Sequence, residues 1–274
     1  MQLSLPAPLV LVGAGNMGGA LLKGLLAQGL DPELIVAIDP SPPEPMRAML
    51  AGHGIHCHAA APDLVSPPAA IVLAVKPQIM DAVAPKVAPL AGFTTVVLSV
   101  AAGRTIASLA RHFAPGTAIV RSIPNTPAAV GRGITVAIAN ATVTPAQHEL
   151  CDKLLAAVGE VAWVADEMLI DAATAVSGSG PAYVFLLAEC LAEAGRAVGL
   201  APELAARLAR ATVSGAGELM RQSELSPAQL RQNVTSPNGT TAAALGVLMA
   251  GDGLQPLLTR AVAAADARAR ALSV

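Results

Sequence analysis

The chain has 274 residues, of which 54% are apolar and 13% charged, and its formal net charge is −2. This length and apolar content suffice for two domains with buried cores. A nearly balanced charge without a basic run argues against a nucleic-acid partner. The mean hydropathy is +0.58, but the uncharged stretches 87–103 and 172–188 are interrupted by Pro, Gly or Ser, which argues against membrane spans.

The cysteines predict neither disulfides nor a metal site. Cys57, Cys151 and Cys190 are widely spaced and form no CxxC pair, so we expect packing residues in a reducing compartment. The segment HGIHCH at residues 53–58 lacks the ligand spacing of a metal motif and is expected to be a solvated connection. The N-terminal residues show no signal-peptide pattern, and a cytoplasmic protein is expected.

Secondary-structure patterns divide the chain into two parts. Short apolar runs alternate with helical patterns at residues 9–13, 34–39, 71–75, 96–100, 118–120 and 135–139. Such alternation predicts a Rossmann-like, mostly parallel sheet with helices on its faces. From about residue 166 the patterns become helical, at 181–198, 202–222, 227–233, 239–250 and 254–272. We therefore expect an α/β dinucleotide-binding domain at 1–165 and an all-α domain at 166–274.

A glycine-rich turn follows the first predicted strand. Gly13, Gly15 and Gly18 form GxGxxG between the run LVLV and a helical pattern. In this context the first glycine allows a tight turn, the second lets a pyrophosphate approach the backbone, and the third lets helix and strand pack closely. Dinucleotide binding is expected here; the alternative is a tight turn without a ligand.

The residue that ends the second predicted strand bears on which dinucleotide binds. Asp39 lies where a carboxylate would accept a hydrogen bond from a ribose 2′-hydroxyl and repel a 2′-phosphate, which favours NADH. The neighbouring Ser41 offers a hydroxyl and Arg47 a positive charge, which leaves NADPH open.

Three further positions lie at or after the ends of predicted strands, where α/β sheets bind ligands. Lys76 ends IVLAVK and is expected near the nicotinamide, or else is a solvated lysine. Ala102 is small enough for a cofactor ring to approach, and Asn125 in IPNTP can hydrogen-bond the cofactor.

Two segments outside the nucleotide-binding half are rich in hydroxyls and glycine: SGSGPAYVF at 177–185 and TSPNGTT at 235–241. Such segments can direct N–H and O–H donors at a small anion, which predicts a carboxylate substrate. For the second segment, the alternative is that its Ser and Thr residues only cap the helix that follows.

Taken in order, the motifs GAGNMGGALLKGL, AVKPQ, SIPNTPAAVGRG, SGSGPAYVF and TSPNGTT resemble those of the pyrroline-5-carboxylate reductase family nearly from end to end. The first motif is shared by many dehydrogenases, whereas the last two are specific. The resemblance implies reduction of 1-pyrroline-5-carboxylate to L-proline with NADPH or NADH. It also implies that the helical domain forms a homodimer, which assembles into a larger homo-oligomer.

The resemblance assigns the site residues by position. The cofactor would contact Val12, Gly13, Ala14, Gly15, Asn16, Met17, Ala74, Val75, Lys76, Pro77, Ala102 and Asn233, in addition to Gly18, Asp39, Ser41 and Asn125. The substrate would contact Ser177, Ser236, Gly239, Thr240 and Thr241. Glu224 would face the ring nitrogen and favour its protonated form, and Thr174 is the nearest candidate for a proton donor. Lys76 is the third catalytic candidate.

One position departs from the family pattern. Asn238 stands where the family usually has the first of two glycines. Asparagine tolerates left-handed backbone angles better than other non-glycine residues, so the loop is expected to keep its form.

Two other functions stay open at this point. A β-hydroxyacid dehydrogenase would share the glycine turn and the domain layout, but those enzymes typically use a lysine of the helical domain. No lysine follows Lys153 here. A protein that senses a dinucleotide without turnover would have no need of a carboxylate-binding loop.

Overall fold

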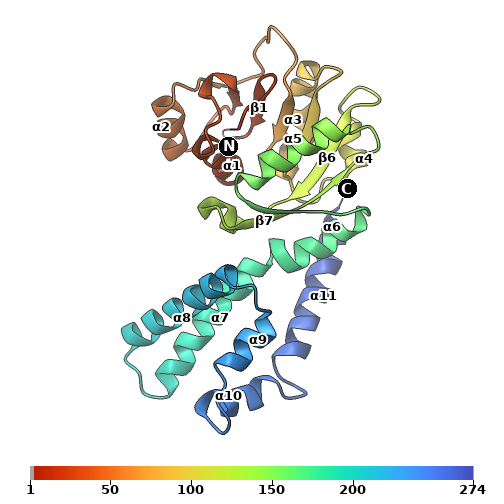
Figure 1. The fold of residues 1–274 in the computed structure, drawn as a ribbon. Coiled ribbons are helices and arrows are strands. Elements are labelled where there is room, and N and C mark those ends of the chain that lie inside the picture. Colours follow the sequence, from red (N-terminus) through yellow and green to blue (C-terminus); the bar gives the residue numbers. More distant parts are fainter. Residues whose placement is uncertain (1–2, 274) are drawn as a thin grey trace. The chain divides into compact units, whose positions relative to one another are not determined.

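The computed structural model describes residues 3–273 (Figure 1). They form two compact units. The first comprises the described residues of Met1–Gly178 and Asp266–Val274, and the second is Ser179–Ala265. The two units meet after Gly178, whereas the expected boundary between the functional domains follows residue 165. That domain boundary stays a prediction.

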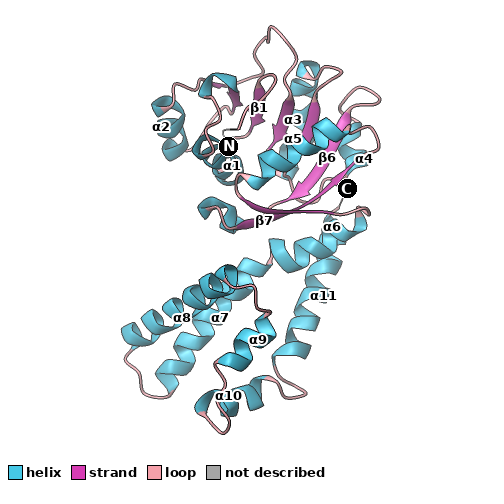
Figure 2. Ribbon diagram, in the orientation of Figure 1, coloured by secondary structure: helices cyan, strands magenta, loops and turns pink. Residues whose placement is uncertain are grey.

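The first unit is built on one eight-stranded sheet (Figure 2). Its strands are β1 (Leu9–Val12), β2 (Ile35–Ile38), β3 (Cys57–His58), β4 (Ala70–Leu73), β5 (Val96–Ser99), β6 (Ala118–Ile123), β7 (Gly133–Ala139) and β8 (Gly159–Trp163). Their order across the sheet is β3-β2-β1-β4-β5-β6-β7-β8. Only β6 and β7 pair antiparallel. The mostly parallel Rossmann-like sheet is confirmed.

Helices and short turns connect the strands. The longer ones are α1 (Asn16–Ala27), α2 (Glu44–Gly52), α3 (Met80–Val87), α4 (Ile106–Ala110), α5 (Pro145–Ala156) and α6 (Met168–Ala173). The 3-10 turns are η1 (Pro32–Leu34), η2 (Pro77–Ile79), η3 (Ala88–Leu90) and η4 (Thr126–Val130), and η5 (Thr174–Gly178) is one turn of π-helix. Thr144 and Gln147 form a reciprocal capping box that starts α5, as the Thr-x-x-Gln pattern predicts.

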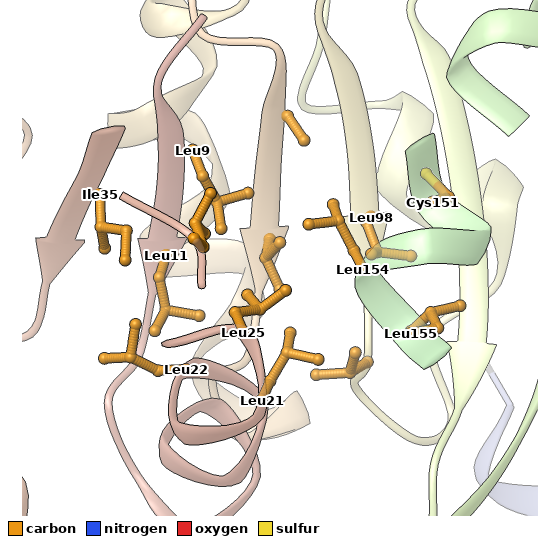
Figure 3. Close-up of a cluster of buried hydrophobic side chains, with 14 of the residues drawn as sticks. Leu9, Leu11, Leu21, Leu22, Leu25, Ile35, Leu98, Cys151, Leu154 and Leu155 are labelled. Carbon is orange, nitrogen blue, oxygen red and sulfur yellow. The ribbon is translucent and has the colours of Figure 1, made fainter. Parts of the chain in front are cut away.

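Both faces of the sheet are buried. Alternate residues of β1 enter different cores: Leu9 and Leu11 pack with α1 and α5 on one face, as Figure 3 shows, and Val10 and Val12 pack on the other. The second core contains α3 and Leu109 of α4. A strand buried on both faces has no polar alternation, which is why these strands read as continuous apolar runs.

Two strands were missed by the sequence patterns. β8 alternates between exposed and half-buried residues, so it lacks a continuous apolar run. β3 contains only Cys57 and His58 and pairs with β2. The expectation of a solvated connection at residues 53–58 was therefore wrong in part, because backbone pairing at the sheet edge places two of these residues in a strand.

A buried arginine joins β6 to the segments that follow the sheet. Arg121 is 1% exposed, and its guanidinium contacts Glu167 Oε1 at 2.8 Å and Asp171 Oδ1 at 3.1 Å. Ile106 donates its backbone N–H to the same Glu167 oxygen, and the Ser273 hydroxyl donates to Asp171 Oδ1. The two ion pairs attach α6 to the sheet of the first unit, and the hydrogen bond from Ser273 attaches the residues after α11 (Leu254–Leu272) to α6.

The second unit is helical. It contains α7 (Gly180–Ala197), α8 (Pro202–Gln222), α9 (Pro227–Asn233), α10 (Thr240–Leu248) and most of α11 (Leu254–Leu272). The predicted helices are confirmed. Pro181, Pro202 and Pro227 lie in the first turns, where a missing N–H costs nothing.

The helices of the second unit bury little within one chain. Within the described residues 179–265, only Ala205 and Ala209 are buried. Phe185, Leu186 and Leu219 are among the large apolar side chains that are more than half exposed. Exposed apolar surface on this scale is typical of a subunit interface.

We predict that Leu22→Ala destabilises the first unit by about 2–5 kcal/mol, because it leaves a cavity beneath α1. Leu22 is fully buried in the core of Figure 3. Urea unfolding followed by circular dichroism measures the change. Lys23→Ala, at the exposed neighbouring position of α1, is the control and should change the free energy of unfolding by less than about 0.5 kcal/mol. Equal effects of the two substitutions would contradict the prediction.

Candidate functional site

The glycine-rich turn between β1 and α1 has the form that phosphate binding requires. Gly13 has φ +94°, and a Cβ there would lie 2.8 Å from the Ala74 carbonyl oxygen. A Cβ at Gly18 would collide with the Gly13 carbonyl. Gly15 has no atom within 4 Å of the place where its Cβ would be, so this side of the turn is open to a ligand. Gly13 and Gly18 therefore allow close packing of the backbone, and Gly15 leaves space for a ligand.

The first turn of α1 is also available to an anion. Gly15 is the N-cap of this helix, and no side chain caps it. The backbone N–H groups that follow it, from Asn16 to Gly18, have no partner four residues earlier within the helix. Such donors, together with the helix dipole, stabilise a phosphate. These residues therefore fit the pyrophosphate of a dinucleotide.

Asp39 lies directly after β2 and is held against the turn. One carboxylate oxygen accepts the Ala14 N–H and the other accepts the Ser41 N–H, each at 2.8 Å. Arg47, the nearby cation, pairs instead with Glu44 at 3.3 Å and is exposed. The carboxylate is thus fixed at the strand end, and the Arg47 charge is shared with another carboxylate.

The ends of β4 and β5 border a cavity of about 400 Å³ in the first unit. Pro77 and Gln78 line it after β4, and Ala102, Gly103 and Arg104 line it after β5. Asp171, Thr174, Ala269 and Leu272 complete the lining. Lys76 immediately precedes this lining as the N-cap of η2. The structure therefore brings Ala102, Pro77 and Thr174 together around one cavity, although they are far apart in the sequence.

Thr174 and Ser177 lie in the π-helical turn η5. Thr174 Oγ1 donates to the Ile170 carbonyl at 2.7 Å, and Ser177 Oγ donates to the Ala173 carbonyl at 2.9 Å. Each hydroxyl proton is therefore used within the helix, and each oxygen can still accept a hydrogen bond. Single π turns inside α-helices are frequent at functional sites. This arrangement suits Thr174 as an acceptor better than as an acid.

Asn125 has a second role that its motif does not reveal. Its Nδ2 donates to the Ser177 carbonyl at 3.1 Å, and its Oδ1 accepts the Ile134 N–H at 3.0 Å. The side chain thus links the strand region after β6 to η5. Its contact with the cofactor stays a prediction.

In the second unit, the TSPNGTT segment forms a tight turn before α10. Gly239 donates its N–H to the Ser236 carbonyl at 3.1 Å. Pro237 and Asn238 occupy the central positions, and Asn238 has φ 58°. Among the described residues it is the only non-glycine residue with positive φ. The left-handed angle expected of Asn238 is confirmed, and a proline followed by a left-handed residue is the pattern of a type II turn.

The start of α10 is not capped by its own side chains. Gly239 is the N-cap and has no side-chain cap hydrogen bond, so the interpretation of this segment as only a helix cap is not supported. A Cβ at Gly239 would collide with the Ser236 hydroxyl oxygen, which makes glycine necessary beside Ser236. The N–H groups and hydroxyls of Thr240 and Thr241 therefore remain as donors for a carboxylate.

Two predicted residues lie near this segment in the sequence. Glu224 is exposed in the connection between α8 and α9. Asn233 ends α9, and its side-chain oxygen accepts a hydrogen bond from Gln229 Nε2 at 3.0 Å. Neither is buried, so each can meet a ligand or a second subunit.

Sequence reasoning missed Arg104, Asp171 and Gln78 as cavity residues. Arg104 carried a usable signal, because it follows the end of β5, and α/β sheets bind ligands beyond the carboxyl ends of their strands. Asp171 carried none, since only the fold brings α6 beside β6. No group of His, Cys, Asp and Glu in residues 3–273 is arranged to hold a metal ion.

Two models of known protein families match two separate parts of the chain. Residues 167–272 match the model "Pyrroline-5-carboxylate reductase dimerisation", and residues 8–103 match "NADP oxidoreductase coenzyme F420-dependent". Among the described residues, the helical stretch Met168–Ala197 is long and apolar enough to cross a membrane by length and composition alone. It lies within the dimerisation match, where subunit contact accounts for apolar surface.

Two curated relatives are named pyrroline-5-carboxylate reductase. The pyrroline-5-carboxylate reductase of Pseudomonas aeruginosa is 43% identical over 96% of this chain and 95% of its own length. That of Pisum sativum is 38% identical over 96% and 94%.

Structural comparison agrees with the sequence comparison. The enzyme structure from Coxiella burnetii has a TM-score of 0.91 at 37% identity and covers 98% of this chain and 100% of its own. The structure from Plasmodium falciparum, with NADP bound, has a TM-score of 0.80 at 29% identity over 98% and 99%. With its cofactor turn, its uncapped α10 and these similarities, the chain belongs to the pyrroline-5-carboxylate reductase family.

Proposed function

We propose that the chain reduces 1-pyrroline-5-carboxylate to L-proline with NADPH or NADH, as the last step of proline biosynthesis. It is then an oxidoreductase that acts on a CH–NH group. The observation that carries this proposal is the uncapped start of α10 after the turn of Ser236–Gly239. A dinucleotide turn alone is common to many dehydrogenases, whereas a carboxylate-binding loop in a lysine-free helical domain is not.

The substrate carboxylate is bound by the start of α10. Ser236, Thr240 and Thr241 supply hydroxyls, and Gly239 allows the close approach of Ser236. A carboxylate at the N-terminus of α10 is stabilised by the helix dipole and by the unpaired N–H groups. Binding at this fixed end orients the ring, which is the main catalytic contribution we expect from the chain.

The ring nitrogen needs a negative environment, because a protonated imine accepts hydride more readily than a neutral one. The exposed carboxylate of Glu224 supplies this charge. Thr174 Oγ1, whose proton is donated to Ile170, accepts the N–H of the ring. Ser177 lies in the same turn and contributes a second oxygen. The substrate then binds already protonated, and no separate acid is required.

The residues at the edge of the sheet where the parallel strands end would hold the dinucleotide, which would supply the hydride. The turn from Val12 to Gly18 binds its pyrophosphate, and Asp39 and Ser41 face the adenosine ribose. The nicotinamide would be bordered by the segment Ala74 to Pro77, which includes Lys76, and by Ala102. Asn125 and Asn233 complete the predicted contacts.

The second unit forms a homodimer, in agreement with the dimerisation match. Its exposed Leu, Val and Phe side chains are covered by the partner chain. We further propose that dimers assemble into a larger homo-oligomer and that the enzyme works in the cytoplasm.

The purified chain is expected to oxidise NADH or NADPH when 1-pyrroline-5-carboxylate is added, because both binding sites for the reaction are present. Absorbance at 340 nm, followed for minutes, measures turnover, and proline formation confirms the product. The control replaces the substrate with a β-hydroxyacid and uses oxidised cofactor. Turnover only in the control, or in neither assay, would refute the proposed reaction.

Thr241→Val is expected to raise the KM for 1-pyrroline-5-carboxylate by about tenfold or more, since it removes a hydrogen bond to a charged group, worth about 1.5–3 kcal/mol. The KM for the cofactor should change little. Thr259→Val removes an exposed threonine hydroxyl from α11 and is the control. An unchanged substrate KM would remove Thr241 from the carboxylate anchor.

Asp39→Ser is expected to shift the ratio of kcat/KM for NADPH over NADH upward by about tenfold, because it removes a negative charge from the adenosine ribose site. Steady-state kinetics with both cofactors measures the ratio. Asp63→Ser removes an equal charge at an exposed position of the first unit and should leave the ratio unchanged. If the two variants behave alike, Asp39 does not set the cofactor preference.

A further inference from the structure

We propose that Arg104 is a positioning residue for the nicotinamide half of the cofactor site. It joins the segment that follows β4 to the segment that follows β5 and keeps both at a fixed separation. This inference rests on the proposed function, because it concerns the same cofactor. Neither the sequence motifs nor the family matches assign a role to this residue.

The guanidinium of Arg104 makes four hydrogen bonds. Nε and Nη2 donate to the Pro77 carbonyl at 3.0 and 2.6 Å. Nη1 and Nη2 donate to the two carboxylate oxygens of Asp81 at 3.0 and 2.7 Å. Pro77 begins η2, and Asp81 lies in the first turn of α3. One side chain after β5 therefore holds two successive turns after β4.

This geometry requires arginine. The planar guanidinium presents its N–H groups in a rigid fork that matches a carboxylate and a second acceptor at once, whereas the ammonium of lysine is a single point charge. Arg104 is 7% exposed. The Asp81 side chain is 57% exposed, and because solvent screens an ion pair with one exposed partner, this pair contributes more to geometry than to stability.

The segments that Arg104 joins are those that border the cavity. Pro77 directly follows Lys76, and Arg104 directly follows Ala102 and Gly103. Gly103 has φ +72°, and a Cβ there would lie 3.0 Å from the Leu272 carbonyl oxygen. The backbone beside Arg104 therefore packs closely against Leu272, and the Pro77 carbonyl is hydrogen-bonded to Arg104. The width of this side of the cavity depends on the contact.

The acceptor carboxylate is itself fixed by a second contact. His112 Nε2 lies 2.9 Å from Asp81 Oδ1. Hydrogen bonds from Arg104, and then from His112, hold the pKa of Asp81 below its usual range. Asp81 is therefore ionised at neutral pH, where it can accept both bonds from Arg104.

The order of the strands assigns this contact to one half of the dinucleotide. β1 lies between β2 and β4, and β5 is the next strand beyond β4. Asp39 after β2 marks the adenosine side. The ends of β4 and β5 lie on the other side of β1, where the nicotinamide must lie. Loss of the Arg104 contact should therefore weaken the nicotinamide half alone.

The test compares two ligands that differ in that half. Calorimetric titration of the full chain, without pyrroline substrate, measures the Kd for NADH and for ADP-ribose, which lacks the nicotinamide. Arg104→Lys is expected to raise the Kd for NADH by about tenfold and to leave that for ADP-ribose within about twofold. Arg111→Lys, at an exposed arginine just after α4, is the matched control and should change neither value.

Two results would overturn the proposal. One is an unchanged Kd for NADH; the other is an equal rise for both ligands, which would mean that Arg104 only supports the fold. If Arg104→Lys does not fold, Asp81→Asn is used, which keeps the Pro77 contact and removes the acceptor charge. It should weaken NADH binding, and not ADP-ribose binding, by about two- to fivefold, and the same two results count against the proposal. Because no turnover is measured, failure here differs from failure of the proposed reaction.

Discussion

Strand β1 pairs in parallel with β2 on one side and β4 on the other, in unbroken register. This pairing brings three strand ends to one edge of the sheet, with the chain crossing in opposite directions to reach β2 and β4. Ligands bind at such a switch point because the loops on its two sides diverge. The pairing of neighbouring strands also positions the segments that follow them. These are the glycine turn after β1, Asp39 after β2, Lys76–Pro77 after β4 and Arg104 after β5. A slip of one residue in β1 would send its apolar side chains to the wrong faces.

The two anion sites that we propose follow one physical rule. Gly15 is the N-cap of α1 and Gly239 is the N-cap of α10, and neither helix is capped by a side chain. In both places the unpaired N–H groups of the first turn are left for a ligand. One site suits a pyrophosphate and the other a carboxylate. The proposed reaction needs both, and the donors we propose for them are backbone N–H groups and hydroxyls rather than basic side chains.

The helical unit explains the unusual composition. Its helices are rich in alanine and leucine, yet almost none of the described residues 179–265 is buried within one chain. The dimerisation match gives the reason, since a subunit interface buries the same side chains that a core would. Stability of this unit therefore depends on subunit concentration. A subunit interface of this kind accounts for the high content of apolar residues in this unit.

The sequence by itself determined the parallel sheet, the helices after residue 180, the glycine turn and the family. These follow from local patterns: continuous apolar runs, prolines at helix starts, and motifs whose residues are neighbours in the chain. It also predicted that Asn238 could replace a glycine, because backbone preference is a local property. The sequence did not predict strands β3 and β8, because their local apolar patterns are weak and pairing with the neighbouring strand determines their structure. Only the tertiary structure placed Arg104 on Pro77 and Asp81, Asn125 on Ser177, and Arg121 on Asp171. Such contacts join residues that are distant in the chain, and no local pattern records which of them will meet.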